Sequence, residues 1–152
     1  MLSARLVLAA AALCAGITSA AAKDIPPGDV NIEDGQVAKP ISDAPASVAD
    51  GRKFFADRKL GNCLACHANS DMSDQLFHGE VGPSLDGVAD RWTPAQLRAI
   101  VVNSKAVFGP QTVMPGFYSL DVGAHVADQF KGKTILTAEQ VESIVAYLAT
   151  LK

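Results

Sequence analysis

Two cysteines and a histidine stand together in the string GNCLACH, at positions Cys63, Cys66 and His67. Two thiols three positions apart on one helical turn can form thioethers to the two vinyl groups of a single haem. The next residue, His67, is then held beneath the iron as an axial ligand. The C-x-x-C-H string is the attachment signature of c-type haem. We therefore predict one haem c, covalently attached through Cys63 and Cys66.

Other sites that use cysteine and histidine fit this sequence less well. A redox dithiol of the thioredoxin kind requires a βαβ setting, which the sequence lacks. A structural zinc site requires a second ligand cluster, but His78 and His125 lie far apart without partner spacing. A catalytic Cys/His pair does not need the second cysteine. Haem attachment is the interpretation that uses all three residues.

The ligand on the opposite face of the haem has to come from elsewhere in the chain. The candidates are Met72, Met114, His78 and His125, or no residue at all. Met72 follows His67 too closely to reach the opposite face. Met114 lies in an irregular segment, where the following proline restricts it to an extended backbone. Since His/Met ligation is common in cytochromes c, we predict Met114, with His125 as the alternative.

Three further residues are candidates for supporting the haem. An axial histidine normally donates its second ring N–H to a carbonyl, and Pro83, in the Gly82-Pro83 turn, offers a carbonyl without a competing N–H. An ordinary turn is the alternative. Arg91 and Trp92 are candidates for hydrogen bonds to the haem propionates, although a surface arginine and a helix-flanking tryptophan would look the same.

The first element that positions this site is a helix predicted over residues 47–60. Ser47 or Asp50 is its N-cap, and Gly61 ends it. A glycine inside a helix costs about 1 kcal/mol relative to alanine, so an internal glycine usually has a packing reason. Gly51 therefore predicts the close approach of a second helix.

Two further helices are predicted to begin at capping boxes, Thr93 with Gln96 and Thr137 with Gln140. Their predicted buried stripes are Leu97, Ile100 and Val101 in the first, and Val141, Ile144, Val145, Leu148 and Leu151 in the second. Residues 103–121 are expected to be irregular. With no strand pattern and no repeat, the sequence predicts an all-α fold of three to four helices with long loops. A haem is expected to fill its centre.

Charge and composition divide the 152-residue chain into three segments. Residues 1–22 are predicted to be a secretory signal peptide, whose apolar run is too short to span a bilayer, so we expect a periplasmic protein with no membrane insertion after cleavage. Residues 23–46 form an extended proline-rich arm, either a solvated linker or a strap on a partner. Residues 47–152 form the haem domain. A net charge of −3 shows no basic footprint for nucleic acid.

The strings GNCLACH, VGPSLDGVADRW, TVMPGFY and FKGKTILTAEQVESIVAYLATL resemble SoxX, the monohaem subunit of the SoxAX cytochrome of bacterial thiosulfate oxidation. The resemblance covers about residues 50–152. It implies a class I cytochrome c fold in which the first and last helices cross near Gly51 and Phe55. Cys63, Cys66, His67 and Met114 match the attachment and axial positions of that family. Trp92 stands where this family is expected to have tyrosine.

The resemblance also implies partners. SoxX forms a heterodimer with SoxA, whose own haem carries a cysteine ligand, and together they act as an L-cysteine S-thiosulfotransferase on the carrier protein SoxYZ. SoxX accepts the electrons and passes them to a soluble cytochrome c. No nucleophile or general base is evident in this chain, so it is expected not to be catalytic alone. The alternatives are a stand-alone periplasmic electron carrier and a haem-based ligand sensor.

Overall fold

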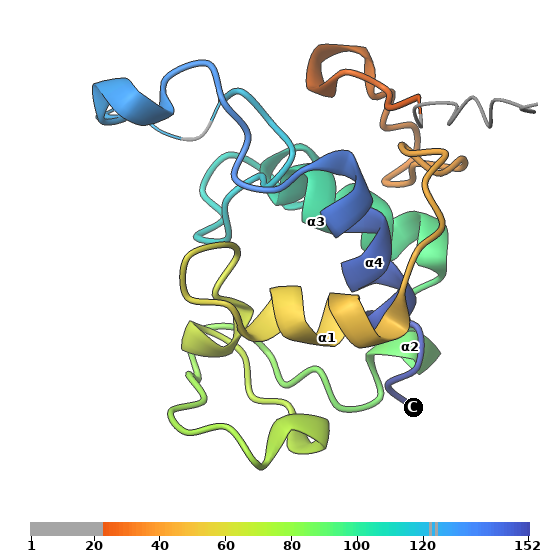
Figure 1. The fold of residues 1–152 in the computed structure, drawn as a ribbon, viewed down its shortest axis with the longest axis vertical. Helices are drawn as coiled ribbons and strands as arrows, with labels where there is room; N and C mark the ends of the chain where they lie inside the picture. Colours follow the sequence, from red (N-terminus) through yellow and green to blue (C-terminus); the bar gives the residue numbers. More distant parts are fainter. Residues whose placement is uncertain (1–22, 122, 124) are drawn as a thin grey trace, which may run out of the picture.

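The computed structural model describes residues 23–121, 123 and 125–152, and the predicted signal peptide lies outside the described residues. Over these residues the chain is helical (Figure 1). The α-helices are α1 (Val48–Ala56), α2 (Val88–Arg91), α3 (Pro94–Phe108) and α4 (Ala138–Leu148); the 3-10 turns are Pro27–Asp29, Cys63–Ala65, Ser70–Met72 and Asp128–Phe130. The described part of the chain has only isolated β-bridges and no strand, so the all-α prediction is confirmed.

The first and last α-helices cross at Gly51, as Figure 1 shows for α1 and α4. A Cβ atom at Gly51 would lie 1.9 Å from the carbonyl oxygen of Ser143 in α4. One turn along α1, the ring of Phe55 packs edge-on against Tyr147, with centroids 5.7 Å apart. The absence of a side chain at Gly51 is therefore what lets the two helices touch, as the sequence predicted.

The C-terminal end of α1 differs from the prediction. Ser47 caps the helix as expected, its hydroxyl accepting from the N–H of Asp50 at 3.1 Å. The helix ends at Ala56, however, and the predicted extension to residue 60 is wrong. Asp57 has an extended backbone, its side chain accepts from the N–H of Lys59, and its carbonyl accepts from Leu60. A side chain that binds its own local backbone competes with helical hydrogen bonds, which explains the early end.

Helices α3 and α4 begin as predicted, each at a complete capping box. All five residues of the stripe predicted for the last helix are buried, and four of them lie within α4. In α3, Leu97 and Val101 are buried, but Ile100 is only half-buried, and Ala99 and Val102 face the core instead. The regular helix is interrupted at Asn103, where the irregular segment was predicted to begin, but a second helical segment then runs to Phe108, so residues 104–108 are helical where irregular structure was expected.

Residues 23–46, hereafter the strap, fold back on their own domain and run down one side of it in Figure 1. Ile41 is fully buried, and its N–H donates to Glu142 of α4 at 2.8 Å. Arg98 of α3 donates to the carbonyl of Val37 at 2.9 Å. The strap therefore contacts α3 and α4 through buried polar atoms, which a solvated linker does not do.

A buried ion pair stands behind the strap. The guanidinium of Arg98 donates hydrogen bonds to both carboxylate oxygens of Glu142, at 2.7 and 3.0 Å. Both side chains are almost inaccessible to solvent. The same two groups bind the strap backbone at Val37 and Ile41. Every polar atom of the pair is thereby matched, which is the condition under which a buried pair can be tolerated.

Breaking this pair should destabilise the protein strongly. We expect Glu142→Leu to lower the free energy of unfolding by about 3–5 kcal/mol, because Arg98 would stay buried and unpaired. Urea denaturation of the haem-loaded protein measures the change. Arg52→Ala is the matched control, since Arg52 pairs with Asp71 and Asp74 on the surface, where such pairs contribute about 0–1 kcal/mol. Equal losses in the two variants would contradict the prediction.

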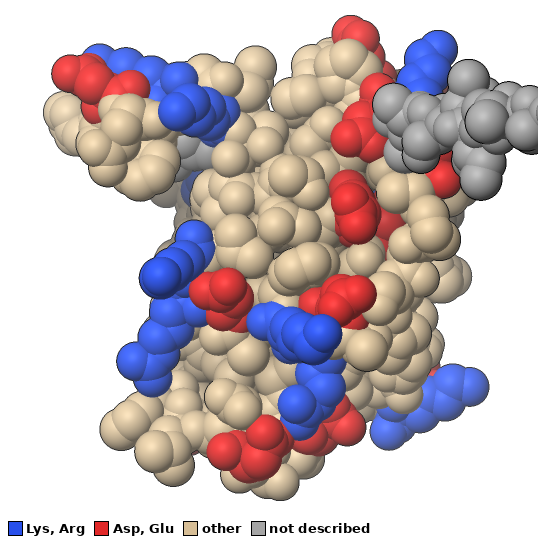
Figure 2. Space-filling model, in the orientation of Figure 1, with Lys and Arg blue, Asp and Glu red and all other residues tan. Residues whose placement is uncertain are grey.

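The charged side chains on the α1 face are mixed in sign. Figure 2 shows lysine and arginine interspersed there with aspartate and glutamate. On this face Lys53 pairs with Asp50 at 2.8 Å, and Arg52 pairs with Asp71 and Asp74 at 3.1 and 2.7 Å. This face thus lacks the continuous basic stripe of a nucleic-acid-binding surface. Among the residues that the structure describes, no helix has the length and apolarity needed to cross a membrane.

Candidate haem-binding site

The C-x-x-C-H segment forms a single tight turn after α1 and the short loop 57–62. Asn62 takes a left-handed backbone with φ of 48°, and the 3-10 turn Cys63–Ala65 follows. The N–H groups of Cys66 and His67 both donate to the carbonyl of Cys63, at 3.1 and 3.0 Å. The turn therefore brings Cys63, Cys66 and His67 together on one compact stretch of backbone.

The environment of Cys63 argues against thiolate chemistry. Burial raises the pKa of the Cys63 thiol to about 12. Reactive cysteines and redox dithiols depend instead on a lowered pKa, because the thiolate is the reacting species. Cys63 packs against the hydrophobic core. This setting suits a thioether better than a nucleophile.

The orientation of His67 is set by the Gly82-Pro83 turn. His67 Nδ1 lies 2.7 Å from the carbonyl oxygen of Pro83. A carbonyl can only accept, so Nδ1 carries the proton and Nε2 keeps its lone pair for a metal. A Cβ atom at Gly82 would lie 2.3 Å from His67 Cε1. The turn thus lies so close to the imidazole that position 82 has room only for glycine.

Two backbone hydrogen bonds fasten this turn to the cysteine segment. The N–H of Gly82 donates to the carbonyl of Cys66, and that of Gly79 to Leu64, both at 2.7 Å. The donor set therefore fits a covalently attached haem. Two cysteines and one imidazole, whose Nε2 is available to a metal, lie on a turn that is fixed by hydrogen bonds from residues 79 and 82. A zinc site is not supported, because the described residues contain no group of three or more His, Cys, Asp and Glu side chains that could hold a metal ion.

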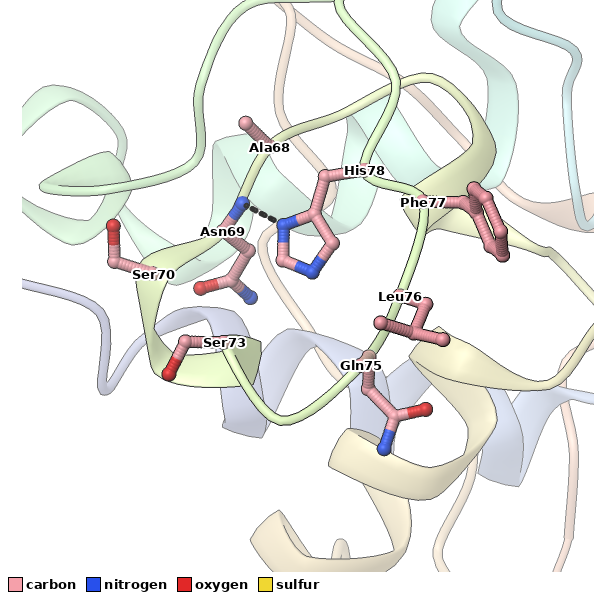
Figure 3. Close-up of a pocket in the computed structure, with 8 residues that line it drawn as sticks. All are labelled: Ala68, Asn69, Ser70, Ser73, Gln75, Leu76, Phe77 and His78. Atoms are coloured by element: carbon pink, nitrogen blue, oxygen red, sulfur yellow. Dashed lines mark hydrogen bonds between the residues drawn. The ribbon is translucent and has the colours of Figure 1, made fainter.

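His78 is occupied within the loop that follows His67. It lies beside a surface hollow lined by Ala68, Asn69, Ser70, Ser73, Gln75, Leu76, Phe77 and His78 (Figure 3). Its Nδ1 accepts from the N–H of Asn69 at 3.3 Å, and its Nε2 lies 3.0 Å from the carbonyl of Met72. Because a carbonyl must receive a proton from Nε2, both ring nitrogens have a partner. His78 thus stabilises the loop and has no nitrogen left for iron.

A buried polar network connects the same loop to α4. Asn69 donates to the hydroxyl of Tyr147 at 2.9 Å, and that hydroxyl donates to Asp71 at 2.7 Å. Burial, together with the hydrogen bond to Asp71, raises the pKa of Tyr147 far above its ordinary value. The hydrogen bonds from Tyr147 and Arg52 lower the pKa of Asp71. The loop behind His67 is therefore held by side chains that stay in one protonation state near neutral pH.

Met114 lies in the loop after α3, half-buried against the hydrophobic core. Its carbonyl accepts a hydrogen bond from the buried hydroxyl of Ser104 at 2.5 Å. Three residues further on, Phe117 donates its N–H to the carbonyl of Val101 at 3.1 Å. Among the other ligand candidates, Met72 is fully buried and His125 is exposed. Met114 is thus the candidate whose backbone is anchored while its side chain is still partly accessible.

Comparison with known proteins agrees with this donor set. Residues 48–152 match the family model described as Cytochrome c. The chain belongs to the cytochrome c family. It therefore carries covalently bound haem c. No curated protein matches the sequence significantly.

Several solved structures are similar to this cytochrome c. It is 40% identical to a chain of SoxXA from P. pantotrophus, with a TM-score of 0.77, covering 85% of this chain and 98% of the other. It is 27% identical to the c-type cytochrome SorU from Sinorhizobium meliloti (TM-score 0.45; 68% and 88% covered). For ferric cytochrome c-550 from Paracoccus versutus the identity is 18% (TM-score 0.39; 70% and 98% covered). The resemblance to SoxX is confirmed.

The two residues predicted to bind propionates have other contacts in this cytochrome c. Arg91 donates to the carbonyls of Asp86 and Ser84, at 2.7 and 2.8 Å, and so supports the loop after Pro83. Trp92 is half-buried and packs edge-on against Phe108, with ring centroids 6.0 Å apart. Arg91 thus stabilises the loop after Pro83, and Trp92 packs against the C-terminal end of α3.

Sequence reasoning missed several residues that shape the site. Asn69 and Tyr147 were not singled out, and nothing local marks a tyrosine on a helix stripe as a hydrogen-bond donor. Ser104 was also missed, although a signal existed. It follows Leu97 and Val101 at helical spacing on the buried side of α3, and it has 0% exposure. A polar residue on an apolar stripe must find a partner, so its position alone could have drawn attention to it.

Proposed function

We propose that this cytochrome c is the SoxX-like electron-transfer subunit of a SoxAX-type heterodimer. It accepts electrons from a SoxA-like subunit while thiosulfate is joined to a cysteine of a SoxYZ carrier, and it passes them to a soluble cytochrome c. The observation that carries this proposal is the 40% identity to a chain of SoxXA over 98% of that chain. The proposed location is the periplasm, reached through cleavage of the signal peptide at residues 1–22.

Within this proposal each site residue has a role. Cys63 and Cys66 would hold the haem through thioethers, and His67 Nε2 and the Met114 sulfur would bind its iron. Pro83 accepts the His67 Nδ1 proton at 2.7 Å and so keeps the ring in one orientation. When bound, haem c supplies a one-electron couple. The thiosulfate chemistry belongs to the partner, and this chain serves as the relay.

Co-expression with a SoxA-like subunit tests the proposal. We expect the two chains to elute together from a size-exclusion column, with haem absorbance in one peak. We also expect the pair to reduce a soluble cytochrome c when thiosulfate and SoxYZ are supplied. A haem-loaded chain that stays monomeric beside its partner, yet exchanges electrons freely with soluble cytochromes, would instead favour the stand-alone carrier.

Replacing Met114 tests the ligand assignment. Met114→Ala is expected to lower the reduction potential of the haem, because thioether ligation favours the ferrous state. It is also expected to open the iron to carbon monoxide, which the wild-type protein should bind slowly. Potentiometry followed by optical spectroscopy measures both. An unchanged potential would mean that Met114 only packs, and rapid binding of carbon monoxide by the wild-type protein would favour the sensor.

A further inference from the structure

Helix α3 is interrupted just before it reaches the Met114 loop. Asn103 has φ of −154° and ψ of 86°, which no α-helix contains. Its side-chain oxygen accepts from the N–H of Ala106 at 3.4 Å, as an N-cap does for a new turn. The helix is therefore two segments joined at Asn103, and the second segment begins with Ser104.

The interruption gives the Met114 loop a docking place on the helix backbone. The carbonyl of Val101 accepts from the N–H of Phe117, and that of Val102 from Tyr118, both at 3.1 Å. In a continuous helix these carbonyls belong to N–H groups four residues on. Gly116 lies close to the break, since a Cβ atom there would be 3.1 Å from the Asn103 side-chain oxygen. The loop is thus attached directly after Met114.

Ser104 holds the loop at Met114 itself. Its hydroxyl is completely buried and donates to the carbonyl of Met114 at 2.5 Å, with the carbonyl of Pro115 at 3.3 Å. The ammonium of Lys105 contacts the carbonyl of Thr112 on the preceding side. Ser104 and Lys105, the first residues of the second α3 segment, therefore bind the loop backbone at Met114 and on its N-terminal side.

We propose that Ser104, presented by the break at Asn103, is a positioning residue that aims the Met114 side chain at the haem iron. The inference rests on the proposed function, in which Met114 is an axial ligand. Loops release their ligands when their backbone is free to move, and the Ser104 hydrogen bond removes that freedom at the ligand residue. Without the hydroxyl, the Met114 carbonyl would lose the hydrogen bond from the buried Ser104, and the ligand-off state would become more populated.

Competition with imidazole for the iron of the ferric haem-loaded protein measures this population. We expect Ser104→Ala to bind imidazole about 5- to 30-fold more tightly, the factor that corresponds to one lost buried hydrogen bond. The charge-transfer absorption of methionine-ligated ferric haem should weaken in the same variant. Ser143→Ala is the matched control. Ser143 is an equally buried serine in α4 whose hydroxyl accepts from the N–H of Ser47, and it should leave imidazole affinity unchanged.

The outcomes distinguish the positioning role of Ser104 from the ligand role of Met114. If Met114→Ala binds imidazole tightly and Ser104→Ala behaves like wild type, the positioning role is wrong while the ligand assignment stands. If Met114→Ala also behaves like wild type, the ligand assignment itself fails. Equal gains in Ser104→Ala and Ser143→Ala would mean general loosening and would overturn the inference. Should Ser104→Ala not fold, Ser104→Cys keeps a weak donor of similar size and is expected to show a smaller increase.

Discussion

Gly82→Ala is expected to lower the yield of haem-loaded protein by about 5- to 100-fold. The added Cβ would lie 2.3 Å from His67 Cε1 and 2.7 Å from Nδ1. An unligated imidazole can swing away from such a clash, but an imidazole bound to iron and to the Pro83 carbonyl cannot. Overpacking costs about 1–3 kcal/mol, and each 1.4 kcal/mol is about a factor of ten in an equilibrium.

Covalent haem per mole of purified protein measures this effect, by absorbance after denaturation and by intact mass. Gly28→Ala is the matched control, because a Cβ atom at Gly28 meets nothing within 4 Å. Its yield should equal that of the wild type. A Gly82→Ala protein with full haem content and an unchanged ferric spectrum would show that the turn does not press on the imidazole.

The second large effect is expected at the crossing of α1 and α4. Gly51→Ala should lower the free energy of unfolding by about 3 kcal/mol or more, at or above the upper end of the overpacking range. The built Cβ lies 1.9 Å from the Ser143 carbonyl oxygen and 2.9 Å from Tyr147 Cβ. A backbone carbonyl cannot rotate away without breaking α4. Helix propensity alone predicts the opposite sign, a gain of about 1 kcal/mol.

Urea denaturation of the haem-loaded protein distinguishes these signs. Ala49→Gly in the exposed part of α1 gives the reference value for propensity, an expected loss of about 1 kcal/mol. Gly51→Ala must exceed that loss clearly. A variant as stable as the wild type would mean that α1 and α4 do not approach as closely as the structure has them.

Features that depend on near neighbours were predictable from the sequence. The capping boxes at Thr93 and Thr137 join residues three positions apart, so their hydrogen bonds require no knowledge of the fold. The apolar stripe of the last helix follows from helical period alone. The early end of α1 is the local feature that was missed, because the Asp57 carboxylate found a partner in the backbone two residues on.

Polar contacts between distant charged and amide side chains were beyond prediction. Arg98 and Glu142 are 44 positions apart, and Ile41 and Glu142 are 101 apart. Neither an arginine nor a glutamate on a helix signals burial, since both residue types are usually exposed. Only packing of the strap against α3 and α4 removes them from water and pairs them. The same holds for Tyr147 and Asn69, which are 78 positions apart.

The chemistry of this protein was written in the sequence itself. Cys63, Cys66 and His67 lie within one short stretch of chain, so one turn suffices to bring them together, and they determine covalent haem attachment. Tertiary structure decided how that group is held: it distinguished the Pro83 carbonyl as the His67 partner from an ordinary turn, gave both His78 nitrogens a partner, and broke the helix that carries Ser104 to Met114. These depend on which segments meet in space, and a hydrogen bond between segments is specified by the packing of the whole core rather than by either partner.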